Sequence, residues 1–271
     1  MRFRHLMLAL LAAVMLLGMM ACGQKQEQQA ATNEMDEQEQ PAFIFFPLPT
    51  FKQVFAKLDY VETADYSKAL PATYTRVEGN SLKQAYQLGA LTADAIFCTK
   101  ARDDARLDDI AKVMMYYADM LGIQDQINPL TDRLTQLLET KQWDELEVTL
   151  EEERQNVVAA LHREGEYDIF MLLQVGGWNE ALYNLTYLLL DGEFDQATTS
   201  ILFEIGTLNQ LIANYETIPS DRVMEKEFYA VSLEKLKEIR EVLLTGQDQT
   251  LSRDAVQNIH DKTAEIRAAF E

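Results

Sequence analysis

The stretch "YDIFMLLQVGGWNEALYNLTYLLL", Tyr167 to Leu190, decides the fold. Wound at about 3.6 residues per turn, it is apolar on nearly every side, and a helix of that kind belongs in the centre of a bundle. Gly176 and Gly177 lie inside the pattern, where small residues allow a second helix to pack closely. We therefore predict a central helix over residues 167–190.

The segments on either side repeat apolar residues at helical spacing. Leu82, Tyr86, Gly89, Ala93 and Phe97 form one such stripe, and none of these segments shows sustained β alternation. Predicted caps are Asn128 before Pro129 and Ser220, and predicted stops are Gly165, Gly192 and Gly246. The sequence predicts an all-α fold with eight helices, over residues 81–103, 106–121, 129–140, 143–164, 167–190, 193–216, 220–245 and 252–270.

These helices can be grouped into two related halves of four. A shift of 87 places lays Gln87-Leu88-Gly89 on Gln174-Val175-Gly176, Asp104 on Asp191 and Asp108 on Asp195. Identity over the aligned positions is low. Two interpretations stay open: a single helical domain, or two pseudo-repeated four-helix units packed together.

The apolar central helix carries polar residues on one face. Glu180 and Asn184 lie one turn apart, with Tyr187 on the same face, and a buried carboxylate needs a partner or a raised pKa. Helix 81–103 likewise places Asp94 among Ala90, Leu91 and other apolar residues. The candidate ligand-binding residues are Asp94, Glu180, Asn184 and Tyr187.

Two interpretations of these acids stay open. They line a polar pocket between helices 81–103 and 167–190, suited to a cation or a small polar ligand. Alternatively they pair with basic residues of neighbouring helices, for instance Arg102 or Arg106, or reach the surface.

Recognisable catalytic motifs are absent from the sequence. Beyond the first residues the only histidines are His162 and His260, on different predicted helices, so no zinc site of ordinary spacing is expected. There is no Gly-x-Ser-x-Gly and no glycine-rich phosphate loop, and Cys98 lies in an apolar stretch typical of a buried thiol. We predict no catalytic residues, no metal site and no cofactor.

The chain is strongly acidic, with 24 Lys and Arg against 44 Asp and Glu and a formal net charge of −20. Such a surface repels nucleic-acid phosphates and anionic headgroups, which argues against binding to either. Only two cysteines are present, Cys22 and Cys98.

The N-terminus resembles an export signal. Arg2 and Arg4 precede an apolar run from Leu6 to Ala21, which would cover roughly 24 Å as a helix and is short for the roughly 30 Å core of a bilayer. Removal of residues 1–21 would take away two positive charges and change the net charge from −20 to −22.

The tetrad Met19-Met20-Ala21-Cys22 resembles the lipobox of bacterial lipoproteins. The resemblance covers only the first twenty-odd residues and implies cleavage before Cys22, which is then acylated with chains such as palmitate. In Gram-negative lipoproteins an aspartate after that cysteine tends to retain the protein at the inner membrane, and here the position is Gly23. The resemblance therefore implies an anchor in the outer membrane, facing the periplasm.

Two segments separate this anchor from the helices. Residues 22–40 hold the lipidated cysteine and a Gln/Glu-rich stretch that is too polar to fold, which we interpret as a disordered tether. Residues 41–79 are rich in proline and aromatic residues, and we predict little regular structure in them. Phe43, Phe45 and Phe46 either pack across the helices in 80–271 or form a docking strip for a partner or the bilayer interface.

These observations favour an envelope lipoprotein whose acidic helical domain is a non-catalytic scaffold or interaction module with a protein partner in the envelope. The alternative is a periplasmic helical bundle that binds a small ligand or cation through Asp94, Glu180 and Asn184. An enzyme would need acid and base groups arranged by the fold without a local signature.

Overall fold

The computed structural model describes residues 58, 61, 64–123, 133, 136–137, 139–146, 148–149, 152, 156, 161 and 165–271, all within one compact unit, Phe43–Glu271. The longer helices in these ranges are α3 (Ser81–Ala101), α4 (Asp104–Met120), α7 (Tyr167–Leu190), α8 (Ile205–Glu216), α10 (Glu227–Leu244) and α11 (Arg253–Phe270). Short elements are the 3-10 helices η2 (Tyr66–Ala69) and η3 (Ala197–Leu202) and the single turn α9 (Asp221–Met224). In the part of the chain described, β pairing is limited to an isolated bridge between Gln247 and Thr250. The predicted all-α class is confirmed.

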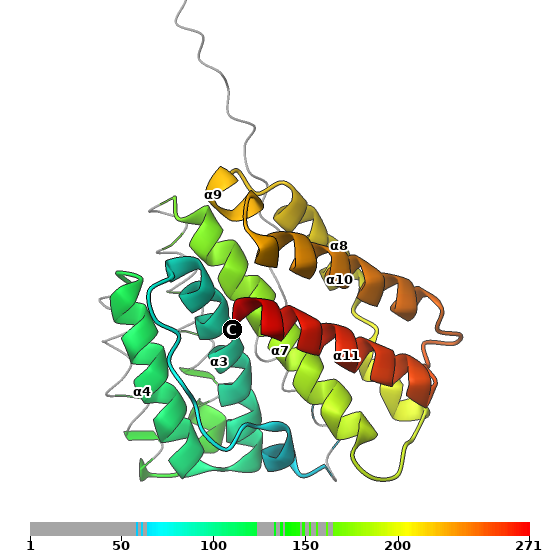
Figure 1. Ribbon diagram of the computed structural model, residues 1–271. Coiled ribbons are helices and arrows are strands. Elements are labelled where there is room, and N and C mark those ends of the chain that lie inside the picture. Colours follow the sequence, from blue (N-terminus) through cyan, green and yellow to red (C-terminus); the bar gives the residue numbers. More distant parts are fainter. Residues whose placement is uncertain are drawn as a thin grey trace, which may run out of the picture. The chain divides into compact units, whose positions relative to one another are not determined.

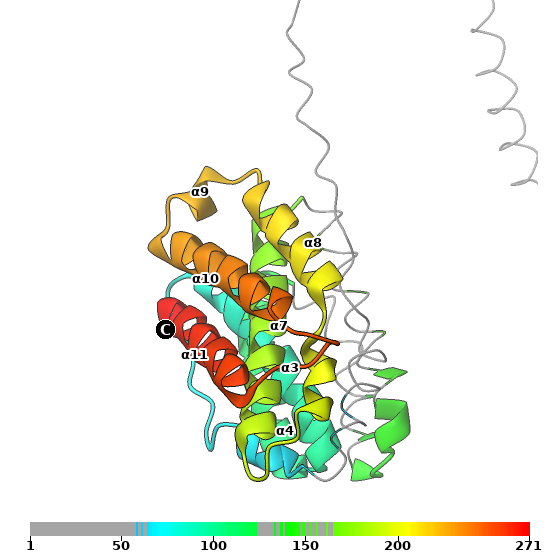
Figure 2. The ribbon, with the colours of Figure 1, turned by 90° about the vertical axis from the view of Figure 1, so that its right-hand side faces the viewer.

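Helices α3 and α7 lie side by side at the centre (Figures 1 and 2). Residue 86 contacts residue 176 and residue 94 contacts residue 184, which shows that the two helices run in the same direction. Helix α7 has the bounds predicted from the sequence and is buried on most of its surface. Asn80 caps α3 by accepting hydrogen bonds from the amides of Leu82 and Lys83.

The C-terminal helices cover α7. Helices α10 and α11 pack against each other in opposite directions, and α11 also packs on α7 (Figure 1). Surface ion pairs along the α10–α11 seam join Lys262 to Glu238 at 2.5 Å and Lys235 to Glu265 at 3.1 Å. The apolar residues of α11 that face inward are all fully buried: Val256, Ile259, Ile266 and Phe270.

The prediction of one unbroken helix over 220–245 is wrong. Ser220 is an N-cap as expected, but of the short α9, and Lys226 adopts an extended backbone with φ −89° and ψ 141° before α10 begins. Val223 and Phe228 are both buried. Five residues apart, they would differ by about 140° around a continuous helix, so the break lets both face the core.

The predicted helix 193–216 is also divided, into η3 and α8, with Phe203 and Glu204 between them. Predicted stops at Gly165 and Gly192 coincide with positive φ angles of 73° and 100°. From Ala64 to Asn80 the regular structure consists of η2 alone.

Several predictions lie wholly or partly outside the described residues. These are Cys22 with the signal peptide and tether, the phenylalanines at 43, 45 and 46, Asn128 with Pro129, and most of helices 129–140 and 143–164. In the part of the chain that is described, no helix is both long enough and apolar enough to span a bilayer.

Candidate functional site

The contact between α3 and α7 depends on glycines. A Cβ atom on Gly89 would lie 1.9 Å from the carbonyl oxygen of Leu173, and one on Gly176 would lie 2.0 Å from that of Tyr86. The backbones therefore touch, which only glycine permits, and the expected role of small residues in this helix is confirmed. The 87-residue shift relates the two contacts to each other: it places residue 89 on residue 176, and residue 86 on residue 173. Gly89 against Leu173 thus corresponds to Gly176 against Tyr86. The duplication itself stays a prediction.

This close approach brings three of the candidate residues together in the core. Asp94, Glu180 and Asn184 are buried, with side chains from α3 and α7 facing each other. The Asn184 amide Nδ2 donates to Asp94 Oδ1 at 2.7 Å. The two carboxyl groups lie within hydrogen-bonding reach of each other. The sequence therefore located a real polar cluster.

Helix α11 supplies the counter-ion. Arg267 Nε lies 3.1 Å from Glu180 Oε2, and the guanidinium carbon stacks 4.1 Å from the ring centroid of Tyr183. The Arg267 side chain is 28% exposed, whereas that of Glu180 is 3% exposed. Of the two alternatives left open by the sequence, these contacts match pairing with a neighbouring arginine, but the arginine is neither Arg102 nor Arg106.

Burial dominates the electrostatics of the two acids. It raises the pKa of Asp94 to about 6, against the lowering effect of the Asn184 hydrogen bond. It raises the pKa of Glu180 to about 8, where the negative charge of Asp94 adds to the rise and Arg267 opposes it. The carboxyls therefore retain protons to a higher pH than ordinary acids.

Some buried polar atoms in this region have no hydrogen-bond partner among the described residues. They include Glu180 Oε1 and Asn184 Oδ1. Buried polar groups are normally satisfied, so unpartnered oxygens beside two acids point to a proton, a water or a cation that takes them up.

A second set of polar contacts fastens α11 to the central pair. Asn179 Nδ2 donates to the Tyr86 hydroxyl at 2.9 Å and to the backbone carbonyl of Thr263 at 3.1 Å. The ring of Tyr86 stacks on that of Phe270 with centroids 3.8 Å apart. The sequence analysis did not identify Asn179, Tyr86 and Arg267 as site residues. Arg267 could have been noticed, because it lies one turn after Thr263 on the face of α11 that packs inward.

Tyr187, the fourth candidate residue, is only partly buried and lies near His260. Its ring centroid is 6.3 Å from that of His260. His260 stacks on Tyr183 at 4.4 Å and shares a 3.0 Å hydrogen bond with Thr186. No hydrogen bond in the described residues links Tyr187 to Asp94 or Glu180.

Cys98 is a core residue, as the sequence predicted. It is fully buried and unpaired. Burial raises the pKa of its thiol to about 12, and the charge of Asp94 adds to this. A thiol in this environment stays protonated and unreactive.

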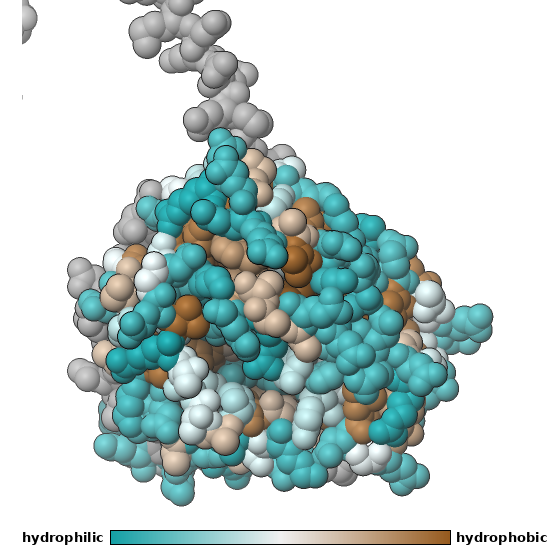
Figure 3. Space-filling view, in the orientation of Figure 1, coloured by the Kyte–Doolittle hydropathy of each residue, from teal (hydrophilic) through white to brown (hydrophobic). Residues whose placement is uncertain are grey.

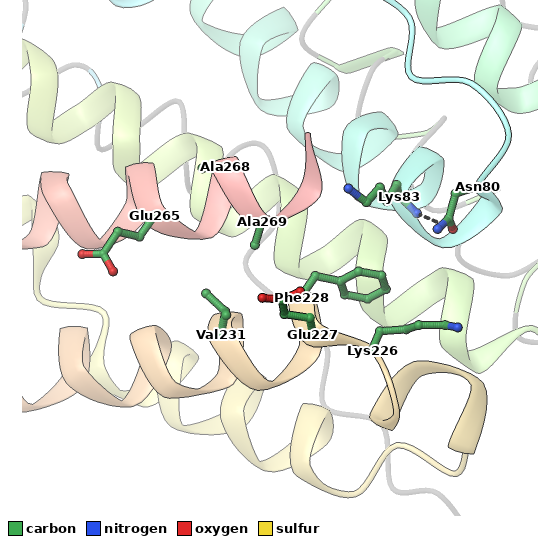
Figure 4. A pocket seen from close by; sticks show the side chains of 9 residues that line it. All are labelled: Asn80, Lys83, Lys226, Glu227, Phe228, Val231, Glu265, Ala268 and Ala269. Atoms are coloured by element: carbon green, nitrogen blue, oxygen red, sulfur yellow. Dashed lines mark hydrogen bonds between the residues drawn. The ribbon is translucent and has the colours of Figure 1, made fainter.

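The surface has a hollow of about 630 Å³ where α10, α11 and the start of α3 meet. In Figure 3 apolar side chains gather there between charged ones. Figure 4 shows Val231 facing Ala269 across the hollow, Phe228 between Lys83 and Lys226, and Glu265 at the opposite end. The hollow thus has an apolar floor and a rim of mixed charge.

Within the described ranges, no three His, Cys, Asp or Glu residues are grouped to hold a metal ion. No family model matches the chain, and none of the curated proteins or solved structures is significantly similar to it.

Proposed function

We propose that the chain is a lipid-anchored protein of the cell envelope whose helical domain acts as a non-catalytic interaction module. The anchor is Cys22, acylated after cleavage, and its resemblance to outer-membrane lipoproteins at Gly23 supports the periplasmic face of that membrane. Several acyl chains on one cysteine give a stable anchor where a single chain does not.

One observation carries the non-catalytic part of this proposal. The acids that the sequence singled out are turned inward, where Asn184 holds Asp94 and Arg267 holds Glu180. They join three helices to one another and are almost completely buried. The acidic surface is left to make the contacts with other molecules, and the expected partner is a protein of the envelope.

The test of the anchor compares the full-length chain with Cys22→Ala in a Gram-negative host. Mass spectrometry of the N-terminal peptide should find acyl chains on Cys22, and fractionation should place the protein in the outer membrane. The Cys22→Ala chain should lack the acyl mass and leave that fraction. An unmodified Cys22 in a processed chain would overturn the anchor.

The interaction role needs a separate test. A photoreactive amino acid replaces Val231 in the hollow of Figure 4 or, as a control, exposed Glu234 on the same helix. Irradiation of intact cells should give a defined adduct from position 231 that is absent from position 234. No adduct from either position would count against the hollow as the contact surface.

The unpartnered oxygens favour a second candidate function, a bundle that binds a cation or small polar ligand at Asp94, Glu180 and Asn184. Carboxylate and amide oxygens are ligands that hard cations prefer. Thermal unfolding of the chain and of Glu180→Gln with divalent cations and small metabolites tests it. A rise in melting temperature that the variant loses would support binding, and no rise with any of them would remove this candidate.

A further inference from the structure

Two buried carboxyl groups share one partly exposed cation between α3, α7 and α11. Arg267 Nε lies 3.1 Å from Glu180 Oε2, and Nδ2 of the neutral Asn184 amide donates to Asp94 Oδ1 at 2.7 Å. If both acids were ionised, the cluster would carry one uncompensated negative charge. An uncompensated charge in a protein interior is strongly unfavourable, and a single added proton removes it.

The remaining oxygen of Glu180 shows where that proton belongs. Oε1 is buried and receives no hydrogen bond from the described residues, while the carboxyl of Asp94 lies within hydrogen-bonding reach. Two ionised carboxylates can only accept hydrogen bonds, so they repel each other, whereas a protonated oxygen donates. A proton on Glu180 Oε1 that is donated to Asp94 satisfies both groups.

We propose that Asp94 and Glu180 hold one proton between them as a carboxylic acid–carboxylate pair, and that this proton fastens α3 to α7. The inference goes beyond both proposed functions, because it needs neither a partner protein nor a ligand. When base removes the proton, Glu180 becomes a carboxylate, water is formed, and two like charges face each other across the helix pair. Helices α3 and α7 then keep the Asn179–Tyr86 and Asn184–Asp94 hydrogen bonds but lose the one between the two carboxyl groups.

The surrounding groups agree with one retained proton. Burial raises the pKa of both acids, which agrees with one proton being retained between them. Arg267 is the cation that opposes this rise most directly. Other titratable groups lie near the pair: Tyr74 before α3, Tyr86 and Cys98 on α3, and Glu271 at the end of α11. Arg106 on α4 lies near Tyr74 and Cys98, and Tyr183 on α7 and His260 on α11 lie near Arg267.

Infrared spectroscopy of the full-length chain in detergent tests the proposal directly. A protonated carboxylic acid has a carbonyl stretch above the amide band that shifts in heavy water. Near neutral pH the wild type should show this band, and raising the pH by about two units should remove it. Glu180→Gln should lack the band at both pH values, while Glu238→Gln, which removes a surface acid paired with Lys262, should keep it. A folded wild type without the band near neutral pH would overturn the proposal.

Two further measurements cover the alternatives. If Glu180→Gln does not fold, Asp94→Asn replaces it: there Glu180 has only Arg267 beside it and ionises, so the band should again disappear. Exchange of choline for sodium, potassium or calcium ions at constant pH and ionic strength should leave the wild-type band in place. Loss of the band together with a higher melting temperature would show that a metal cation occupies the pair, which overturns this proposal and supports the second candidate function.

Discussion

Arg267 reaches back from the last helix so that its Nε lies 3.1 Å from Oε2 of Glu180. The guanidinium also lies over the face of Tyr183, with 4.1 Å between its carbon and the ring centroid. One cation thus contributes both a charge-assisted hydrogen bond and a cation–π contact between α11 and α7. Arg267 is therefore one of the residues that fasten α11 to the central pair, together with Thr263 and Phe270.

Replacement of Arg267 by Met should destabilise the chain in a pH-dependent way. Loss of one partner from a buried ion pair costs about 3–5 kcal/mol when the other charge remains. A protonated Glu180 needs no counter-ion, so the loss should be largest near pH 9 and clearly smaller near pH 5. Guanidinium titrations followed by circular dichroism measure it.

The matched control is Arg240→Met, which removes a surface pair with Glu241. Its effect should stay below about 1 kcal/mol at every pH. If Arg267→Met were as mild as Arg240→Met at high pH, Arg267 would not be the counter-ion of Glu180.

Gly89→Ala should be severely destabilising. The new Cβ would lie 1.9 Å from the backbone carbonyl oxygen of Leu173, and backbone atoms cannot rotate away as a side chain can. The helices would have to separate, at a cost of about 3 kcal/mol or more. Gly206→Ala in α8 meets nothing within 4 Å and should stabilise by up to about 1 kcal/mol. Melting temperatures that fall equally for both variants would contradict the close packing of α3 on α7.

The sequence predicted the centre of this fold better than its periphery. Residues 167–190 are apolar on nearly every side, a pattern typical of the central helix of a bundle, and α7 has those bounds. Asp94, Glu180 and Asn184 were found because a polar side chain amid apolar neighbours is unusual. Arg267 was not found in this way. It is one of several charged residues in the last helix, and the sequence does not show which of them packs against α7.

The break before α10 shows a second limit. The apolar spacing from Ser220 to residue 245 is compatible with one helix, and Lys226 has no local reason to leave it. The helix ends because Val223 and Phe228 must both reach the same core, which is a tertiary requirement. Local propensity had no access to that requirement.

The two cysteines allow one thiol count to test burial and lipidation together. Cys98 is buried with a raised thiol pKa, and an acylated Cys22 has no free thiol. The processed chain should therefore react with no maleimide when native and with one equivalent in denaturant. Two equivalents in denaturant would show that Cys22 is unmodified.

The free energy of unfolding should fall as pH rises from about 5 to about 9. Asp94 and Glu180 both have raised folded-state pKa values, about 6 and about 8, so their contribution is full below their unfolded pKa values and is lost as pH passes through the folded ones. A pKa that is higher by one in the folded chain corresponds to about 1.4 kcal/mol, which makes the total loss a few kcal/mol. Glutamine resembles a protonated glutamate but does not titrate, so Glu180→Gln should match the wild type near pH 5 and exceed it near pH 9. Denaturant titrations of both proteins at both pH values measure this difference in the free energy of unfolding. A wild type that gains stability towards pH 9 would mean that the two acids are ionised in the folded chain and held by charges other than Arg267.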